Sequence, residues 1–174
     1  EYKKMNKQWS VVKTRKELPI IPNGVGVCYA VEINGKVKIG CTKNIRTRMA
    51  TITEQLIKYA DAAIGCIAYT KPHINYKGNE RLLHSHFAPK RKDSTELFEM
   101  SFDYFLENIP TLNLEIDEEQ SGYKITSADM FLSSLFPAYT VYLEKEYGAS
   151  FLDEQIEYIV DKAEKLGSSF APFE

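Results

Sequence analysis

Residues 25–48 read VGVCYAVEINGKVKIGCTKNIRTR, a pattern that predicts a β-hairpin followed by a helix. The dipeptide Asn34-Gly35 lies between two apolar-rich runs and favours a two-residue turn, because both turn positions must adopt positive φ. A turn of this length fixes how the strands pair, so Tyr29 is expected to face Gly40 across the hairpin. The sequence therefore predicts the strand register as well as the strands.

The hairpin brings two polar groups to one face of the sheet. Side chains alternate between the faces of a strand, so Tyr29 and Lys38 lie on the same face as diagonal neighbours within reach of each other. The helix that follows carries Arg46 and Arg48. A phenol beside an ammonium, next to a helix that bears two guanidinium groups, indicates phosphate chemistry.

The patterns that flank the hairpin predict an α/β fold. Asn44 is expected to cap a helix that runs to about Ala60. Residues 62–69 are expected to form a third strand, and Asn79 is expected to cap a second helix that runs to about Ala88. Together these elements predict a small three-stranded sheet, mixed or antiparallel, that is flanked by helices.

The chain is expected to have three parts: a basic N-terminal arm over residues 1–24, a core over 25–100, and an acidic, mainly helical extension over 101–174. Its 174 residues are enough to bury a hydrophobic core. The extension is expected to hold helices and two short strands, over residues 102–108, 112–116, 123–125, from 127 onward and 150–166.

The net charge of −2 conceals a strong asymmetry along the chain. Residues 1–92 hold 18 Lys and Arg against 6 Asp and Glu, a net charge of +12, whereas residues 93–174 hold 4 against 18, a net charge of −14. A basic half of this size is typical of proteins that bind a polyanion, so nucleic acid is the expected partner. The alternative is two solvated surfaces of opposite sign.

The three cysteines, Cys28, Cys41 and Cys66, show no CxxC spacing, and two of them lie in strand-like apolar runs. Buried thiols are therefore favoured over disulfides, which predicts a cytoplasmic or other reducing intracellular compartment. No apolar stretch approaches the roughly 20 residues of a membrane-spanning helix, so no membrane association is expected.

Five motifs follow one another along residues 24–99. They are Gly26-Val27-Cys28-Tyr29, Lys38-Ile39-Gly40, Lys43-Asn44-Ile45-Arg46-Thr47-Arg48, Glu80-Arg81-Leu82-Leu83-His84-Ser85-His86-Phe87 and Thr95-Glu96-Leu97-Phe98. This series resembles the GIY-YIG nuclease superfamily, in particular its phage-type branch, whose second motif reads Lys-Ile-Gly. The resemblance implies a metal-dependent endonuclease that hydrolyses phosphodiester bonds in nucleic acid, with DNA favoured over RNA and with Mg²⁺ or Mn²⁺ as cofactor.

The resemblance also implies roles for individual residues. Tyr29 would accept a proton from the attacking water, Lys38 would assist, and Arg48 would stabilise charge on the scissile phosphate. Glu80 would bind the single divalent cation, since Mg²⁺ keeps several waters and takes further ligands from the substrate phosphate. His84, one helical turn after Glu80, would orient a metal-bound water or contact phosphate.

Each of these residues has a structural alternative. Arg48 lies on or beside the apolar stripe of its helix, where an arginine also forms internal ion pairs. Glu80 is expected in the first turn of its helix, where a carboxylate also acts as a cap. An inward histidine such as His84 is often structural, and Tyr29 fits a half-buried strand tyrosine. Glu96 is expected to pair with the basic helix or to support the metal site from behind.

Two positions depart from the family pattern. Better-known members have a tyrosine in place of Lys38, and many relatives have a basic residue in place of Cys41. Further basic side chains are expected to contact backbone phosphates, namely Lys43, Arg46, Lys90, Arg91 and Lys92. The departures leave two other functions open: a catalytically inactive nucleic-acid-binding module on the same fold, and a protein-interaction domain that uses the acidic half.

Overall fold

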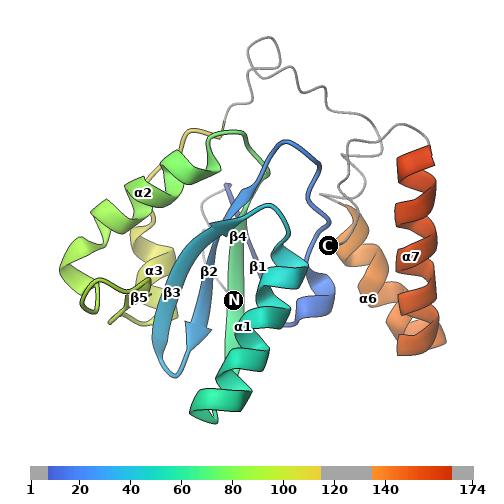
Figure 1. The fold of residues 1–174 in the computed structure, drawn as a ribbon, viewed down its shortest axis with the longest axis horizontal. Coiled ribbons are helices and arrows are strands. Elements are labelled where there is room, and N and C mark those ends of the chain that lie inside the picture. Colours follow the sequence, from blue (N-terminus) through green and yellow to red (C-terminus); the bar gives the residue numbers. More distant parts are fainter. Residues whose placement is uncertain (1–7, 115–134, 166–174) are drawn as a thin grey trace.

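The computed structural model of the chain describes residues 8–114 and 135–165 (Figure 1). The strand expected over 123–125 and the start of the helix expected from 127 lie outside the described residues. Residues 112–114, which were expected to begin another strand, are not part of one.

The centre of the fold is a five-stranded antiparallel sheet with the strand order β1-β4-β2-β3-β5. The strands are β1 (Trp9–Val12), β2 (Val27–Ile33), β3 (Lys36–Thr42), β4 (Ile64–Thr70) and β5 (Leu97–Phe98). The α/β class is confirmed, but the expected number of three strands was too low. The two additional strands lie at the edges of the sheet and have only four and two residues, too few to show a period of their own in the sequence.

The hairpin has the predicted register. Tyr29 pairs with Gly40, and Val31 pairs with Lys38. The turn residues Asn34 and Gly35 have φ values of 49° and 73°, the positive range that a two-residue hairpin turn requires.

The first helix, α1 (Ile45–Ala60), also begins and ends where the sequence predicts. The side chain of Asn44 accepts a hydrogen bond from the backbone N–H of Thr47 at 3.1 Å, which is the expected N-terminal cap. The cap fixes the helix start, and this in turn sets which side chains of α1 face the sheet.

The second helix, α2 (Tyr76–His86), begins earlier than predicted, and Asn79 is not its cap. The Asn79 side chain is buried, and its amide donates to the backbone oxygen of Asn113 at 2.6 Å and to Nδ1 of His73 at 3.2 Å. Glu80 therefore lies in the second turn of α2. The alternative role of Glu80 as an N-terminal cap is not supported by this geometry, because the unpaired N–H groups belong to the first turn.

The sheet is covered on both faces (Figure 1). On one face, α1 and the short helix η1 (Arg15–Glu17) enclose a hydrophobic cluster that includes Tyr29, Met49 and Ile67. On the other face, α2, η2 (Ala88–Lys90) and α3 (Phe102–Asn108) enclose a second cluster. The prediction of a helix over residues 102–108 is confirmed. We call these two sides the α1 face and the α2 face.

The C-terminal part of the described chain is helical, as expected. It consists of α6 (Phe136–Tyr147) and α7 (Ala149–Lys165), and α6 packs against η1. Thr140 donates a hydrogen bond to the backbone oxygen of Lys16 at 2.9 Å, and the Lys16 ammonium pairs with Glu144. The division of the chain into 1–24, 25–100 and 101–174 stays a prediction, although part of the expected arm joins the sheet as β1. None of the described helices combines the length and hydropathy needed to cross a bilayer.

Candidate active site at the free edge of β3

Tyr29 projects from β2 into the α1 face, and its side chain is completely buried. Its hydroxyl lies over Gly40, the residue opposite it on β3: a Cβ atom at position 40 would approach the Tyr29 hydroxyl oxygen to 2.5 Å. No other residue type leaves room for the phenol in this place. The glycine of the Lys38-Ile39-Gly40 motif is thus part of the site because it lacks a side chain.

Arg48 covers the phenol from α1. Its Nε–H donates to the Tyr29 hydroxyl oxygen at 3.0 Å, and its side chain remains 41% exposed. Burial raises the pKa of Tyr29, and the hydrogen bond and charge of Arg48 offset only part of that effect. The same hydrogen bond raises the pKa of Arg48. At neutral pH the pair is therefore a neutral phenol and a guanidinium cation.

Lys38 lies on the same face as Tyr29, as predicted, and pairs with Glu96. The Lys38 ammonium is 2.5 Å from Oε2 of Glu96, and the same oxygen is 4.0 Å from Nη2 of Arg48. Partial burial acts to raise the pKa of Glu96, but the hydrogen bond and charge of Lys38, together with Arg48 and His84, lower it overall. Glu96 is thus an anion shared by the two cations of the site.

The outer edge of β3 is open beyond this ion pair. Within the described chain β5 pairs with β3 only at Val37 and Lys38, and the next backbone contact is Ile39 N–H to the Glu96 carbonyl oxygen at 3.0 Å. From Gly40 onward β3 has no neighbouring strand on that side among the described residues. We call residues 40–42 the free edge of β3.

Glu80 reaches this free edge from α2. Its Oε2 accepts a hydrogen bond from the Cys41 thiol at 3.1 Å, and its charge contributes to raising the pKa values of Tyr29 and Arg48. Burial and then the bond to Glu80 raise the pKa of Cys41 to about 12, so the thiol stays protonated and acts as a donor. Sequence reasoning treated Cys41 only as a missing phosphate contact.

His84 ties α2 to the edge of the sheet. Its Nε2–H donates to the backbone oxygen of Ile39 at 3.1 Å, and its ring lies against Phe98 with 5.3 Å between ring centroids. Because a carbonyl oxygen only accepts, Nε2 carries the proton. The contact holds Glu80, one turn earlier on α2, at the height of the free edge.

Residues 24–112, which make up half of the chain, match the T5orf172 domain. The chain belongs to the T5orf172 domain family. This is a phage-associated domain related to nuclease-like folds, and an endonuclease-like, nucleic-acid-related function is compatible with it. Searches of curated proteins and of solved structures gave no significant match.

Four residues predicted for the site converge within the T5orf172 domain. Tyr29, Lys38 and Arg48, from β2, β3 and α1, are linked by the Tyr29–Arg48 hydrogen bond and by the shared carboxylate of Glu96. Glu80 approaches the same edge of β3 from α2, where it is bonded to Cys41, and its charge contributes to raising the pKa values of Tyr29 and Arg48. Glu96 pairs with Arg48 of the basic helix, as predicted, but sequence reasoning missed its shorter contact, with Lys38. The Thr95-Glu96 motif was a signal for it, but only the pairing of β5 with β3 brings its carboxylate to Lys38.

Arg46 lies apart from the site, although it is only two residues from Arg48. Its Nη1 donates to the backbone oxygen of Leu18 at 2.7 Å, and its guanidinium carbon is 5.8 Å from the ring centre of Phe136. Burial lowers its pKa. Arg46 therefore links the T5orf172 domain to η1 and to α6, which lies beyond the matched residues.

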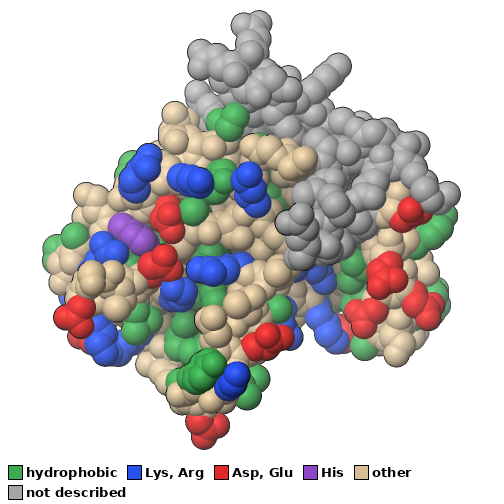
Figure 2. All heavy atoms as spheres, viewed as in Figure 1, with side chains coloured by type: hydrophobic (Ala, Val, Ile, Leu, Met, Phe, Trp, Pro, Cys, Tyr) green, Lys and Arg blue, Asp and Glu red, His purple; other side chains and the backbone are tan. Residues whose placement is uncertain are grey.

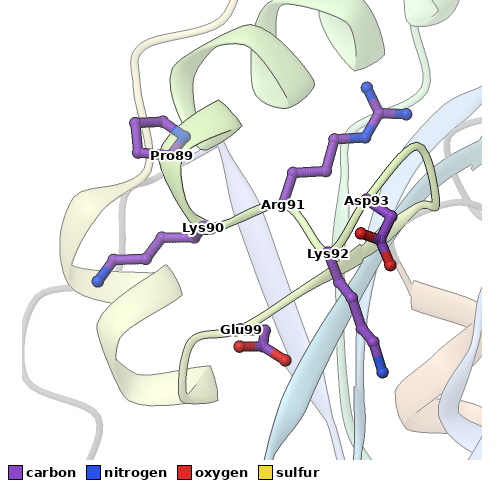
Figure 3. A pocket seen from close by; sticks show the side chains of 6 residues that line it. All are labelled: Pro89, Lys90, Arg91, Lys92, Asp93 and Glu99. Atoms are coloured by element: carbon purple, nitrogen blue, oxygen red, sulfur yellow. The ribbon is translucent and has the colours of Figure 1, made fainter.

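The basic triplet Lys90, Arg91 and Lys92 forms a separate surface of the T5orf172 domain. Together with Pro89, Asp93 and Glu99 it lines an open pocket of about 540 Å³. Figure 3 shows that the three basic side chains point in different directions. The arrangement suits several independent contacts to a surrounding polyanion rather than one enclosed ligand.

The acidic groups of the site suit a hard divalent cation bound through few protein ligands. The described residues contain no cluster of three or more His, Cys, Asp and Glu side chains that would enclose a metal, and no cationic side chain forms an ion pair with Glu80 among them. Mg²⁺ typically binds through one or two carboxylates and completes its shell with water and phosphate. The carboxylate of Glu80 at an open strand edge fits this mode.

Proposed function

We propose that the protein is a metal-dependent endonuclease of the GIY-YIG type that hydrolyses phosphodiester bonds in nucleic acid, with DNA favoured over RNA. The observation that carries the proposal is that Tyr29, Lys38 and Arg48 are linked at the edge of β3, and that Glu80 approaches this edge from α2 through its bond to Cys41. A site that served only to pack the fold would not require a phenol, two cations and two carboxylates close together, because burying charged groups is costly.

In this proposal Lys38 and Arg48 bind the scissile phosphate. Both lie beside one anionic oxygen of Glu96: the Lys38 ammonium donates a hydrogen bond to it, and Nη2 of Arg48 is at ion-pair distance, 4.0 Å, so both are placed near a shared oxyanion. A guanidinium held against a phenol cannot rotate freely, which lowers the reorganisation needed when charge develops on the phosphate.

Tyr29 is the proposed proton acceptor. In the free protein it is a protonated phenol, because burial raises its pKa. Arg48 acts in the opposite direction, since its hydrogen bond and positive charge favour the phenolate. Tyr29 is also fully buried, so the proposed reaction requires water to reach its hydroxyl while Arg48 keeps its place beside the phenol.

Glu80 is the proposed ligand of the cofactor, Mg²⁺ or Mn²⁺. A divalent cation bound there would polarise the phosphate and favour deprotonation of a nearby phenol or water. The protein supplies the carboxylate, held by Cys41, and the position of α2, held by His84. His84 acts in this account by orienting α2 and not by touching the substrate.

The nucleic acid is proposed to lie across the face formed by α1, α2 and β3. Figure 2 shows Lys and Arg side chains gathered over these elements, with acidic side chains between them, whereas acidic side chains predominate on α7. Lys43 and the triplet Lys90–Lys92 would contact backbone phosphates. Arg46 is not included, because its guanidinium faces the carbonyl oxygen of Leu18.

Supercoiled plasmid tests this function. Incubation with Mg²⁺ or Mn²⁺ is expected to give nicked or linear DNA, and a chelator is expected to stop the reaction. Glu80→Gln should abolish cleavage, whereas Glu54→Gln, which makes the same change at an exposed position of α1, should cleave like the wild type. Cleavage by Glu80→Gln at the wild-type rate would contradict the assignment of the metal ligand.

A binding module without catalysis is the second candidate. It is favoured by the closed state of the site, in which Tyr29 is fully buried and the Lys38 ammonium is already paired. Under this alternative the wild type and Glu80→Gln bind DNA equally and neither cleaves it. Binding together with metal-dependent cleavage by the wild type alone excludes it.

A further inference from the structure

Glu96 holds the place between Lys38 and Arg48 that the proposed mechanism gives to phosphate. We propose that the Glu96 carboxylate is a displaceable internal anion, which occupies the phosphate subsite in the free protein and is replaced by a nucleic-acid phosphate on binding. Glu96 thereby determines which anions the subsite accepts. The inference rests on the proposed function, because it concerns the same two cations.

The contacts of Glu96 resemble those of a bound oxyanion. One oxygen, Oε2, is 2.5 Å from the Lys38 ammonium and 4.0 Å from Nη2 of Arg48. A carboxylate and a phosphodiester both present a pair of partly negative oxygens to N–H donors. The donors that bind the Glu96 carboxylate are therefore able to bind a phosphate without a new arrangement of the cations.

Displacement of the carboxylate requires little change elsewhere. The Glu96 side chain is 39% exposed, and ion pairs with this degree of exposure contribute little to stability. Glu96 directly precedes β5, and this segment is anchored through its backbone, by Ile39 N–H to the Glu96 carbonyl oxygen and by Lys92 N–H to that of Leu97. The side chain can therefore rotate away while β5 remains paired with β3.

The charges of the site explain how a displaceable Glu96 carboxylate favours some anions over others. Lys38 and Arg48 carry two positive charges, and Glu96 and Glu80 carry two negative charges, so the closed site has no net attraction for a free anion. A phosphate within a polymer differs, because neighbouring phosphates bound to the surrounding basic side chains raise its effective concentration at the subsite. The subsite thus favours polymeric over free phosphate.

The salt dependence of DNA binding tests the role of Glu96 without cleavage. Binding of a short duplex is measured in chelator at several salt concentrations, for the wild type and for Glu96→Gln. In the wild type a phosphate only replaces one anion by another on Lys38, whereas in the variant it neutralises a free cation. Glu96→Gln is therefore expected to bind about fivefold more tightly at low salt, and its slope of log K against log salt should be steeper by about 0.9.

Two further variants separate this role from a general effect of charge. Glu54→Gln removes the same charge from an exposed position of α1 that forms no ion pair with Lys38 or Arg48, so it leaves the subsite intact. It is expected to keep the wild-type slope. In a Lys38→Gln background, Glu96→Gln should have a smaller effect on affinity than in the wild type, because the main partner of the carboxylate is gone.

Unchanged or weaker binding by Glu96→Gln, with normal binding by the wild type, would overturn the inference and make Glu96 a positioning residue for Lys38 and Arg48. An equal gain from Glu54→Gln would also overturn it. Absence of DNA binding by every protein would instead contradict the proposed function itself. Tighter binding and a steeper slope for Glu96→Gln alone are the expected result.

Discussion

The edge of the α1 face and the interior of the α2 face hold ionisable side chains in different states. On the α1 face, Lys38 and Arg48 are charged and share the anion of Glu96. On the α2 face the buried ionisable groups are neutral: burial raises the pKa of Cys28 and lowers the pKa of His73 to about 4. Buried Tyr29 is neutral as well, so the charged groups are the partly exposed ones at the edge of β3, where Glu80 adds a carboxylate from α2.

This difference predicts which residues affect the rate of the reaction and which affect the stability of the fold. A neutral buried group contributes through packing and hydrogen bonds, and its removal should alter folding more than rate. A charged group at an open edge contributes little to folding but stabilises charge in a bound substrate. The variants below test this separation, in order of decreasing expected effect.

Arg48→Ala should have the largest effect of these variants, and the effect should be on the rate of cleavage. It removes the donor to Tyr29 and one of the two cations of the subsite. Loss of a preorganised donor to developing charge lowers kcat about 100- to 1000-fold. Single-turnover cleavage of plasmid measures the rate, and thermal unfolding measures stability, which should change little. A large loss of stability with normal cleavage would contradict this account, because Arg48 would then serve folding and not the reaction.

His73 should control how stability depends on pH. Folding lowers its pKa from 6.5 to about 4, so between these values the unfolded chain binds a proton that the folded chain excludes. The contribution of His73 to the free energy of unfolding is fully retained above pH 6.5. It is lost as the pH falls toward 4, and the loss is about 3 kcal/mol. Urea unfolding at pH 7 and pH 4 measures the loss.

His73→Asn is the control for this prediction. Asparagine keeps an acceptor for the Asn79 amide but does not titrate. The variant should lose less stability than the wild type over the same pH range. An identical pH dependence in both proteins would show that other groups are responsible.

Gly40→Ala should damage the site through the position of one hydroxyl. The added Cβ would lie 2.5 Å from the Tyr29 hydroxyl oxygen, so the phenol must shift from its present place beside Arg48. A shift of about 1 Å in a reacting group costs about 100-fold in rate. Gly65→Ala is the matched strand control, because its Cβ meets mainly the flexible carboxylate end of Glu32. Equal rates for both variants would contradict the placement of the phenol.

Arg46→Ala should have the smallest effect, and on stability. It removes a hydrogen bond to the Leu18 carbonyl and the contact with Phe136, which together contribute about 1–2 kcal/mol. Thermal unfolding should show a melting temperature lower by several degrees. Cleavage should remain near the wild-type rate. Loss of cleavage comparable to that of Arg48→Ala would show that both arginines act on the substrate.

The parts of the fold that depend on local geometry were predictable from the sequence. The turn Asn34-Gly35 fixes the hairpin register through its own backbone angles, and Asn44 caps α1 through a bond to a residue three positions later. Helical periodicity then placed Arg48 beside the apolar stripe, where it meets Tyr29.

The remaining parts depend on contacts between distant segments, which no local pattern encodes. The predicted start of α2 was wrong, because Asn79 is not a helix cap: its side chain bonds to His73 and to a backbone oxygen 34 residues away. The central position of Glu96 depends on the pairing of a two-residue strand. The place of Arg46 is set by η1 and α6, on either side of it in the sequence.

The most direct test of the central claim compares two tyrosines that face each other on neighbouring strands of the α1 face. Tyr29 on β2 pairs with Tyr69 on β4, and both rings are buried. Tyr29→Phe and Tyr69→Phe each remove one hydroxyl and keep the ring, and single-turnover cleavage with Mg²⁺ measures the consequence. We predict that Tyr29→Phe cleaves at least about 100-fold more slowly and that Tyr69→Phe cleaves like the wild type. Equal rates for Tyr29→Phe and the wild type would contradict the account.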